Sequence, residues 1–140
     1  MPTSQDLELV LRIFLAAGLG GIVGLERERR GRPAGLRTFM LVSAGAATFT
    51  VVSIYGFQGL PVSGTDPARV AAQVVTGVGF LGAGLILRQA EQVRGLTTAA
   101  SIWAVAAIGL AAGTGLYWVA VSTTVLVALI LYVLRLLEIA

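Results

Sequence analysis

The chain has 140 residues, of which 56% are hydrophobic and 12% charged, and this composition excludes an ordinary soluble domain while the length suits a single domain. The net charge of +3 comes from ten arginines without any lysine, and these lie mostly between apolar runs, so we expect no nucleic-acid partner. Cysteine and histidine are both absent, which excludes disulfides, thiolate or imidazole metal ligands and histidine-activated nucleophiles, so we expect no enzymatic activity.

Long runs without charged residues predict membrane-spanning helices. These runs cover residues 38–65, 70–87 and 95–134, and a helix needs about 20 mostly apolar residues to cross a bilayer. The last run is long enough for two crossings. We therefore predict an all-α, polytopic membrane protein with five transmembrane helices, at about residues 6–25, 38–57, 67–88, 98–113 and 115–136.

The segments between these helices carry helix-capping and turn residues. The N-terminal stretch MPTSQDLELVLR is acidic and has no A-x-A cleavage site, so we expect it to be retained as the start of the first span. Asp66 is placed to cap the third helix, Thr97 or Thr98 to cap the fourth, and RQAEQVRG between them predicts a short polar hairpin. We expect residues 1–140 to form one transmembrane domain without a soluble C-terminal domain.

The arginines predict how the chain is oriented in the membrane. Short cytoplasmic loops collect arginine, and alternating five spans puts eight of the ten arginines on one side. These eight are Arg27, Arg29, Arg30, Arg32, Arg37, Arg88, Arg94 and Arg135. We therefore expect the N-terminus outside and the C-terminus in the cytoplasm of a multi-pass protein of the bacterial inner membrane.

The stretch TGVGFLGAGLIL contains a G-x-G-x-x-G pattern at Gly77, Gly79 and Gly82, followed by Gly84. A dinucleotide-binding loop would need a strand before these glycines and an acidic residue about 20 positions after them. Here a helix already begins near Asp66, and the nearest downstream acid, Glu91, comes too early. We interpret the glycines as a surface where membrane helices pack closely, because small residues let helix backbones approach each other.

Stripes of small residues at helical spacing support this interpretation in four helices. They comprise Ala16, Gly20 and Gly24 in the first; Ala72, Thr76, Gly79 and Ala83 in the third; Gly109 and Gly113 in the fourth; and Ala120, Thr124 and Ala128 in the fifth. We expect Gly20, Gly24, Gly79, Gly82 and Gly84 to serve helix packing. Because five helices offer few internal pairings, several stripes are free to face a second copy, and a homo-oligomer is expected.

Polar residues at membrane depth form a first candidate functional cluster on the outer side. It comprises Arg12, Asp66, Arg69 and Gln73. At about 1.5 Å per residue, Arg12 and Gln73 lie at similar depth and are close enough in height to meet. Structural roles are the alternative: Asp66 as a helix cap, and Glu8 with Arg12 as an ion pair four residues apart.

A second candidate cluster flanks the helices on the cytoplasmic side. It comprises Glu26, Glu28, Arg37, Arg94, Thr97 and Thr98. The alternative for its arginines is that they only set topology. Magnesium takes oxygen ligands and usually one or two carboxylates, which Asp66 or Glu26 would provide. Because no three acids lie together and arginines stand nearby, the ligand count does not support a magnesium site, and no cofactor is predicted.

Three stretches resemble the MgtC/SapB family of membrane proteins, specifically its N-terminal transmembrane domain. They are GLERERRGRPAGLRT at 24–38, DPARVAAQVVTGVGFLGAGLILR at 66–88, and VRGLTTAASIWAVAAIGLAAGTGLY at 93–117. The resemblance implies a bacterial inner-membrane protein linked to adaptation to low magnesium and, in pathogens, to survival inside phagocytes. It also implies regulation through membrane partners, including the F-type ATP synthase. Many members continue into a soluble cytoplasmic domain beyond the stretch matched here.

The resemblance implies that particular positions within the three stretches are functionally important. These are Glu26, Glu28, Gly35 and Arg37 in the first stretch; Asp66, Arg69, Gln73, Gly79, Gly82 and Gly84 in the second; and Arg94, Thr97 and Thr98 in the third. Our first hypothesis is a regulatory membrane protein without enzymatic activity. The alternative is a channel or transporter for Mg²⁺ or another small ion that uses the outer cluster, and a lipid-modifying enzyme without histidine is a distant third.

Overall fold

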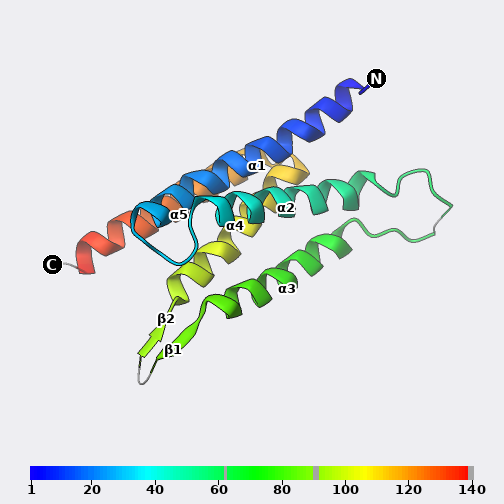
Figure 1. Cartoon of the computed structure of the whole chain (residues 1–140). Coiled ribbons are helices and arrows are strands. Elements are labelled where there is room, and N and C mark those ends of the chain that lie inside the picture. The colour runs from blue at the N-terminus through cyan, green and yellow to red at the C-terminus, as the bar shows by residue number, and fades with distance from the viewer. Residues whose placement is uncertain (62, 90–91, 139–140) are drawn as a thin grey trace.

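The computed structural model describes residues 1–61, 63–89 and 92–138, and the account below concerns these residues. The described chain forms five helices and one short hairpin (Figure 1). The helices are α1 (Ser4–Arg29), α2 (Leu36–Tyr55), α3 (Ala68–Leu85), α4 (Leu96–Thr114) and α5 (Tyr117–Glu138). The hairpin pairs β1 (Leu87–Gln89) with β2 (Gln92–Arg94) in antiparallel register, where the sequence predicts a polar hairpin.

All five helices are long and apolar enough to span a membrane. Each closes its backbone hydrogen bonds within itself, as the absence of water in lipid requires. The prediction of an all-α, polytopic protein with five spans is therefore confirmed. The C-terminal ends of α1, α3 and α5 and the N-terminal ends of α2 and α4 lie together (Figure 1); we call this the arginine end, because Arg27, Arg30, Arg32 and Arg135 lie there.

The helix boundaries lie within about four residues of the predicted ones, and two differences affect the candidate site. The first helix was expected to end near Leu25, but it continues for one more turn to Arg29, which gives Arg27 a helical position with a buried side chain. The predicted cap of the fourth helix by Thr97 or Thr98 is wrong. The cap residue is Gly95, in a left-handed conformation with φ of 90°, and both threonines lie inside the first turn.

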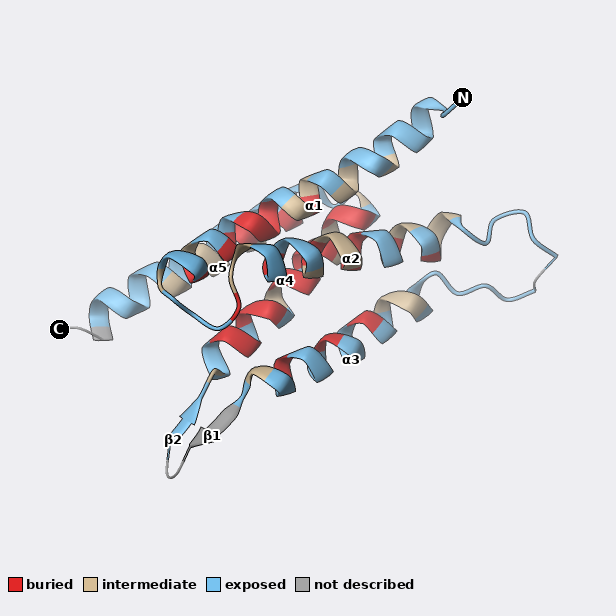
Figure 2. Cartoon of the chain, in the orientation of Figure 1, coloured by how far each residue is buried: buried red, intermediate tan, exposed pale blue. Residues whose placement is uncertain are grey.

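The core lies where α1, α2 and α4 meet, and Figure 2 shows the buried residues gathered on the faces that these helices turn toward one another. A Cβ atom added at Gly20 would lie 2.6 Å from Ser43 Cβ and 2.7 Å from the Phe39 carbonyl oxygen. One added at Gly113 would lie 2.8 Å from the Ala47 carbonyl oxygen. The backbones of these helices are thus in contact, which only glycine permits.

Helix α3 packs with a different stripe from the predicted one. Its buried residues are Val74, Val78 and Gly82, and Gly82 faces Ala99 of α4. The stripe of Ala72, Thr76, Gly79 and Ala83 is exposed. A Cβ added at Gly79 or Gly84 would meet no atom within 4 Å. Within the described chain, Gly20, Gly24 and Gly82 pack against neighbouring helices, whereas Gly79 and Gly84 meet none.

Candidate functional site

Arg12 joins four helices at the end of the bundle opposite the arginine end. Its side chain is 11% exposed. The guanidinium donates hydrogen bonds to the Tyr117 hydroxyl at 3.1 Å, the Gly113 carbonyl at 3.1 Å, the Tyr55 hydroxyl at 3.4 Å and the Glu8 carboxylate at 2.5 Å. Both tyrosine rings also lie about 6 Å from the guanidinium carbon. These contacts neutralise the arginine charge and occupy its donors within the protein.

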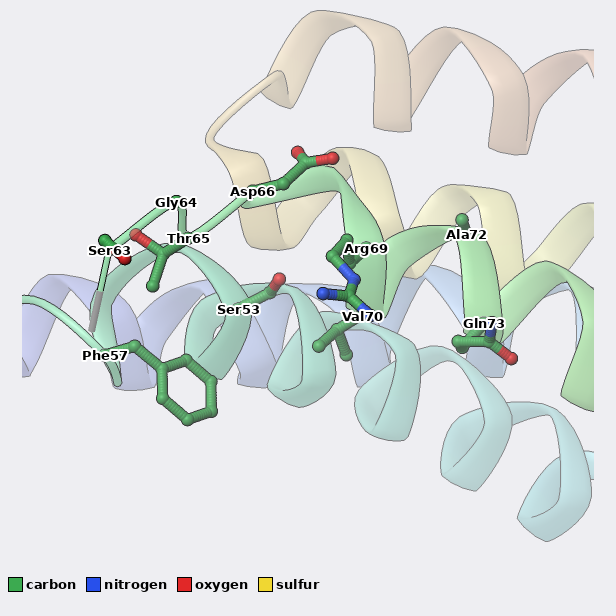
Figure 3. Close-up of a pocket in the computed structure, with 10 residues that line it drawn as sticks. All are labelled: Ser53, Phe57, Ser63, Gly64, Thr65, Asp66, Arg69, Val70, Ala72 and Gln73. Atoms are coloured by element: carbon green, nitrogen blue, oxygen red, sulfur yellow. The ribbon is translucent and has the colours of Figure 1, made fainter.

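The other predicted outer residues surround a separate hollow of about 630 Å³ (Figure 3). Asp66, Arg69 and Gln73 line it together with residues of α2 and of the loop before α3. Arg12 is not among the lining residues, so the expected meeting of Arg12 with Gln73 is wrong. The predicted outer cluster is thus divided into a closed arginine network and an open hollow.

Within this hollow, Asp66 serves mainly to begin a helix. Its carboxylate accepts a hydrogen bond from the Ala68 backbone N–H at 2.8 Å, although the N-cap is Pro67, one residue later than predicted. The Ser53 hydroxyl donates to the Pro67 carbonyl at 2.7 Å, which ties α2 to the start of α3. Figure 3 shows the Asp66 carboxylate and the Arg69 guanidinium pointing to different sides of the ribbon. Asp66 therefore supplies one carboxylate to an exposed, mostly neutral surface.

A second hollow, of about 690 Å³, lies at the arginine end. Its charged lining residues are Glu26, Arg27, Arg30, Arg32 and Arg135. Of the predicted cytoplasmic cluster, Glu26, Thr97 and Thr98 line this hollow. Glu28, Arg37 and Arg94 are exposed and are not among its lining residues. The Glu28 carboxylate instead accepts the Leu36 N–H at 2.7 Å and so fixes the start of α2.

The sequence analysis assigned all four arginines of this hollow only to topology, and Arg27 is the buried one among them. It is 4% exposed, and its Nη2 donates to the Thr98 hydroxyl at 2.6 Å. Arg27 follows Gly20 by seven residues and Gly24 by three, so it lies on the same buried face of α1 as the small residues. This spacing is the sequence signal that distinguishes Arg27 from its exposed neighbour Arg29.

In the described part of the chain, no group of three or more aspartate, glutamate, histidine or cysteine side chains is placed to hold a metal ion. Glu26 forms ion pairs with Arg30 and, at 3.9 Å, with Arg27. The chemistry available at the arginine end is therefore that of guanidinium groups and hydroxyls, which bind anions.

Comparison with known proteins identifies relatives of the whole membrane domain. The profile of the MgtC family matches residues 13–139. A protein of Escherichia coli named "Putative magnesium transporter YhiD" is 50% identical over 129 residues, which are 90% of this chain and 60% of that protein. The protein MgtC of Brucella abortus is 49% identical over 117 residues, covering 84% of this chain and 47% of the relative.

A third relative, the protein MgtC of Salmonella typhimurium, is 44% identical over 118 residues, which are 84% of this chain and 48% of that protein. The chain thus spans about half to 60% of the length of these curated relatives. No solved structure matches it. The family match over residues 13–139, together with five membrane-spanning helices, shows that this multi-pass membrane protein belongs to the MgtC family.

Proposed function

We propose that this protein is a regulator in the bacterial inner membrane that supports adaptation to low magnesium through contacts with other membrane proteins, and that it has no enzymatic activity. The F-type ATP synthase is the partner that the family resemblance suggests. Family membership supports the link to magnesium, since one relative carries the name "Putative magnesium transporter YhiD". In pathogens, the same role would extend to survival inside host cells.

The charge at the arginine end is the observation that most favours regulation over transport. Four arginines and one glutamate line the hollow there. A Mg²⁺ ion would be repelled from this end, because like charges in a partly dehydrated site interact strongly. Among the described residues, no three acidic side chains are grouped to hold a metal ion.

Transport remains the second candidate, and the hollow lined by Asp66 and Gln73 favours it. A flux assay separates regulation from transport: the purified protein is reconstituted in liposomes loaded with a magnesium-sensitive dye. We expect the dye signal after an external Mg²⁺ pulse to equal that of protein-free liposomes, because the arginines at the other end of the bundle repel a divalent cation. A flux that disappears with Asp66→Asn but persists with Gln58→Ala, an exposed substitution in the neighbouring loop, would establish transport instead.

Co-purification tests the regulatory role directly. We expect ATP synthase subunits to be recovered with tagged protein from bacterial membranes in mild detergent, and recovery to fall at least several-fold with Arg37→Ala. Arg37 is exposed at the arginine end and lies outside the hollow, where a cytoplasmic partner can reach it. Arg69→Ala, exposed at the opposite end, is the matched control. Recovery that is absent, or unchanged by Arg37→Ala, counts against this partner contact.

A further inference from the structure

The hollow at the arginine end is positively charged, as a binding site for an anion would be. Four arginine side chains and one carboxylate line it. That carboxylate, of Glu26, forms an ion pair with Arg30, and neither of its oxygens makes a hydrogen bond with the described residues. The remaining positive charge lies at the end of membrane-spanning helices, where its hydration is restricted and a bound anion would stabilise it.

Arg27 adds a buried donor that the protein leaves without a partner. The residue is 4% exposed, and its Nε makes no hydrogen bond with the described residues. One Nη donates to Thr98, and the Glu26 carboxylate stands at 3.9 Å, beyond hydrogen-bonding distance. Because a buried guanidinium is costly unless its donors are occupied, the Arg27 charge is only partly compensated beside the hollow that it lines.

The start of α4 faces the same hollow. Gly95, Leu96, Thr97 and Thr98 all line it. Gly95 caps the helix without any side-chain hydrogen bond, so the first backbone N–H groups are not occupied by a cap. The positive end of the helix dipole therefore adds to the arginine charge, an arrangement that favours phosphate groups.

The hollow also has an apolar side that continues along the bundle. Ile130, Leu131 and Leu134 of α5 form one wall. Glu26 and Arg30 belong both to this hollow and to an adjoining groove of about 700 Å³ between α1 and α5. Aliphatic side chains of both helices line the groove, and at the shared end Arg30 lies 6.0 Å from the Tyr132 ring. A charged hollow that continues into an apolar groove matches a ligand with a charged head and a hydrocarbon tail.

We propose that the hollow binds the headgroup phosphate of an anionic phospholipid, with Arg27, Arg30 and Thr98 around the phosphate and one acyl chain in the groove between α1 and α5. Basic pockets between membrane helices bind such headgroups in other proteins. The proposal goes beyond the regulatory role and does not rest on it, since its evidence is the geometry of the hollow. Inorganic phosphate shares the headgroup chemistry but would leave the apolar groove unused.

Native mass spectrometry of delipidated protein tests the proposal with phosphatidylglycerol and phosphatidylcholine of identical acyl chains. We expect phosphatidylglycerol to bind about tenfold more tightly, as the gain of a charge-assisted hydrogen-bond set predicts. Arg27→Gln should remove this preference. Arg37→Gln, which removes the same charge at the same end but outside the hollow, should retain it.

Arg32→Gln serves as a second variant, because Arg32 is exposed at the rim and its replacement should not disturb folding. We expect it to weaken phosphatidylglycerol binding several-fold while the circular dichroism spectrum stays unchanged. Three results would overturn the proposal: no preference between the two lipids, an equal loss with Arg37→Gln, or displacement of phosphatidylglycerol by millimolar inorganic phosphate. The last would assign the hollow to a free anion. Loss of the ATP synthase contact alone would leave the lipid result unaffected.

Discussion

Gly20→Leu is expected to lower the free energy of unfolding of the helix bundle by about 3 kcal/mol or more, the upper range for overpacking a closed core. Even a Cβ at this position would lie 2.6 Å from Ser43 Cβ and 2.7 Å from the Phe39 carbonyl oxygen. The carbonyl belongs to the backbone of α2 and cannot rotate away, so α1 and α2 would have to separate. Titration of purified protein from mild detergent into SDS, followed by circular dichroism, measures the loss.

Gly79→Leu is the matched control, since it makes the same change on another membrane helix. A Cβ at Gly79 meets no atom within 4 Å, so we expect the free energy of unfolding to change by no more than about 0.5 kcal/mol. An equal loss of stability in both variants would mean that α3 packs against the bundle through Gly79, and not through Val74, Val78 and Gly82. If Gly79→Leu instead leaves stability unchanged but abolishes a homo-oligomer, the exposed stripe is the contact between copies.

The number and type of helices could be predicted because lipid imposes one strong condition. A backbone in the hydrocarbon region must bond to itself, so charge-free runs of sufficient length become helices whatever their neighbours. The face with which each helix packs could not be predicted in the same way. Both stripes of α3 have helical spacing, and the one with Gly79 is richer in small residues, yet Val74, Val78 and Gly82 are buried. Small residues permit close approach, but the position of the neighbouring helix decides which face is used.

The polar residues show a similar division. That Asp66 would start a helix and that Glu8 would pair with Arg12 could be predicted, because both are contacts between residues close in sequence. The partners that Arg12 finds on Tyr55 and Tyr117 are 43 and 105 residues away, and no spacing rule connects them. Arg27 is an intermediate case: its position on the small-residue face of α1 was readable, but its bond to Thr98 depends on the packing of α4 against α1.

Arg12→Met is expected to destabilise the bundle by about 2 to 3 kcal/mol, the cost of removing a partly buried charged donor and leaving its acceptors unsatisfied. The methionine would retain most of the apolar stem but none of the hydrogen bonds. The Gly113 carbonyl at the end of α4 and the Tyr55 hydroxyl of α2 would then lose the donor that connects them to α1. The same SDS titration measures the effect, and Arg12→Lys should recover only part of it, because one ammonium cannot copy the planar spread of the guanidinium donors.

Arg69→Met provides the control for the loss of a charge at this end of the bundle. Arg69 is exposed on α3, so we expect its replacement to change the free energy of unfolding by no more than about 0.5 kcal/mol. A large effect at Arg12 with none at Arg69 would show that stability comes from the contacts of the guanidinium and not from net charge. Comparable effects would instead point to electrostatic anchoring in the membrane interface, and the hydrogen bonds between helices would then contribute little.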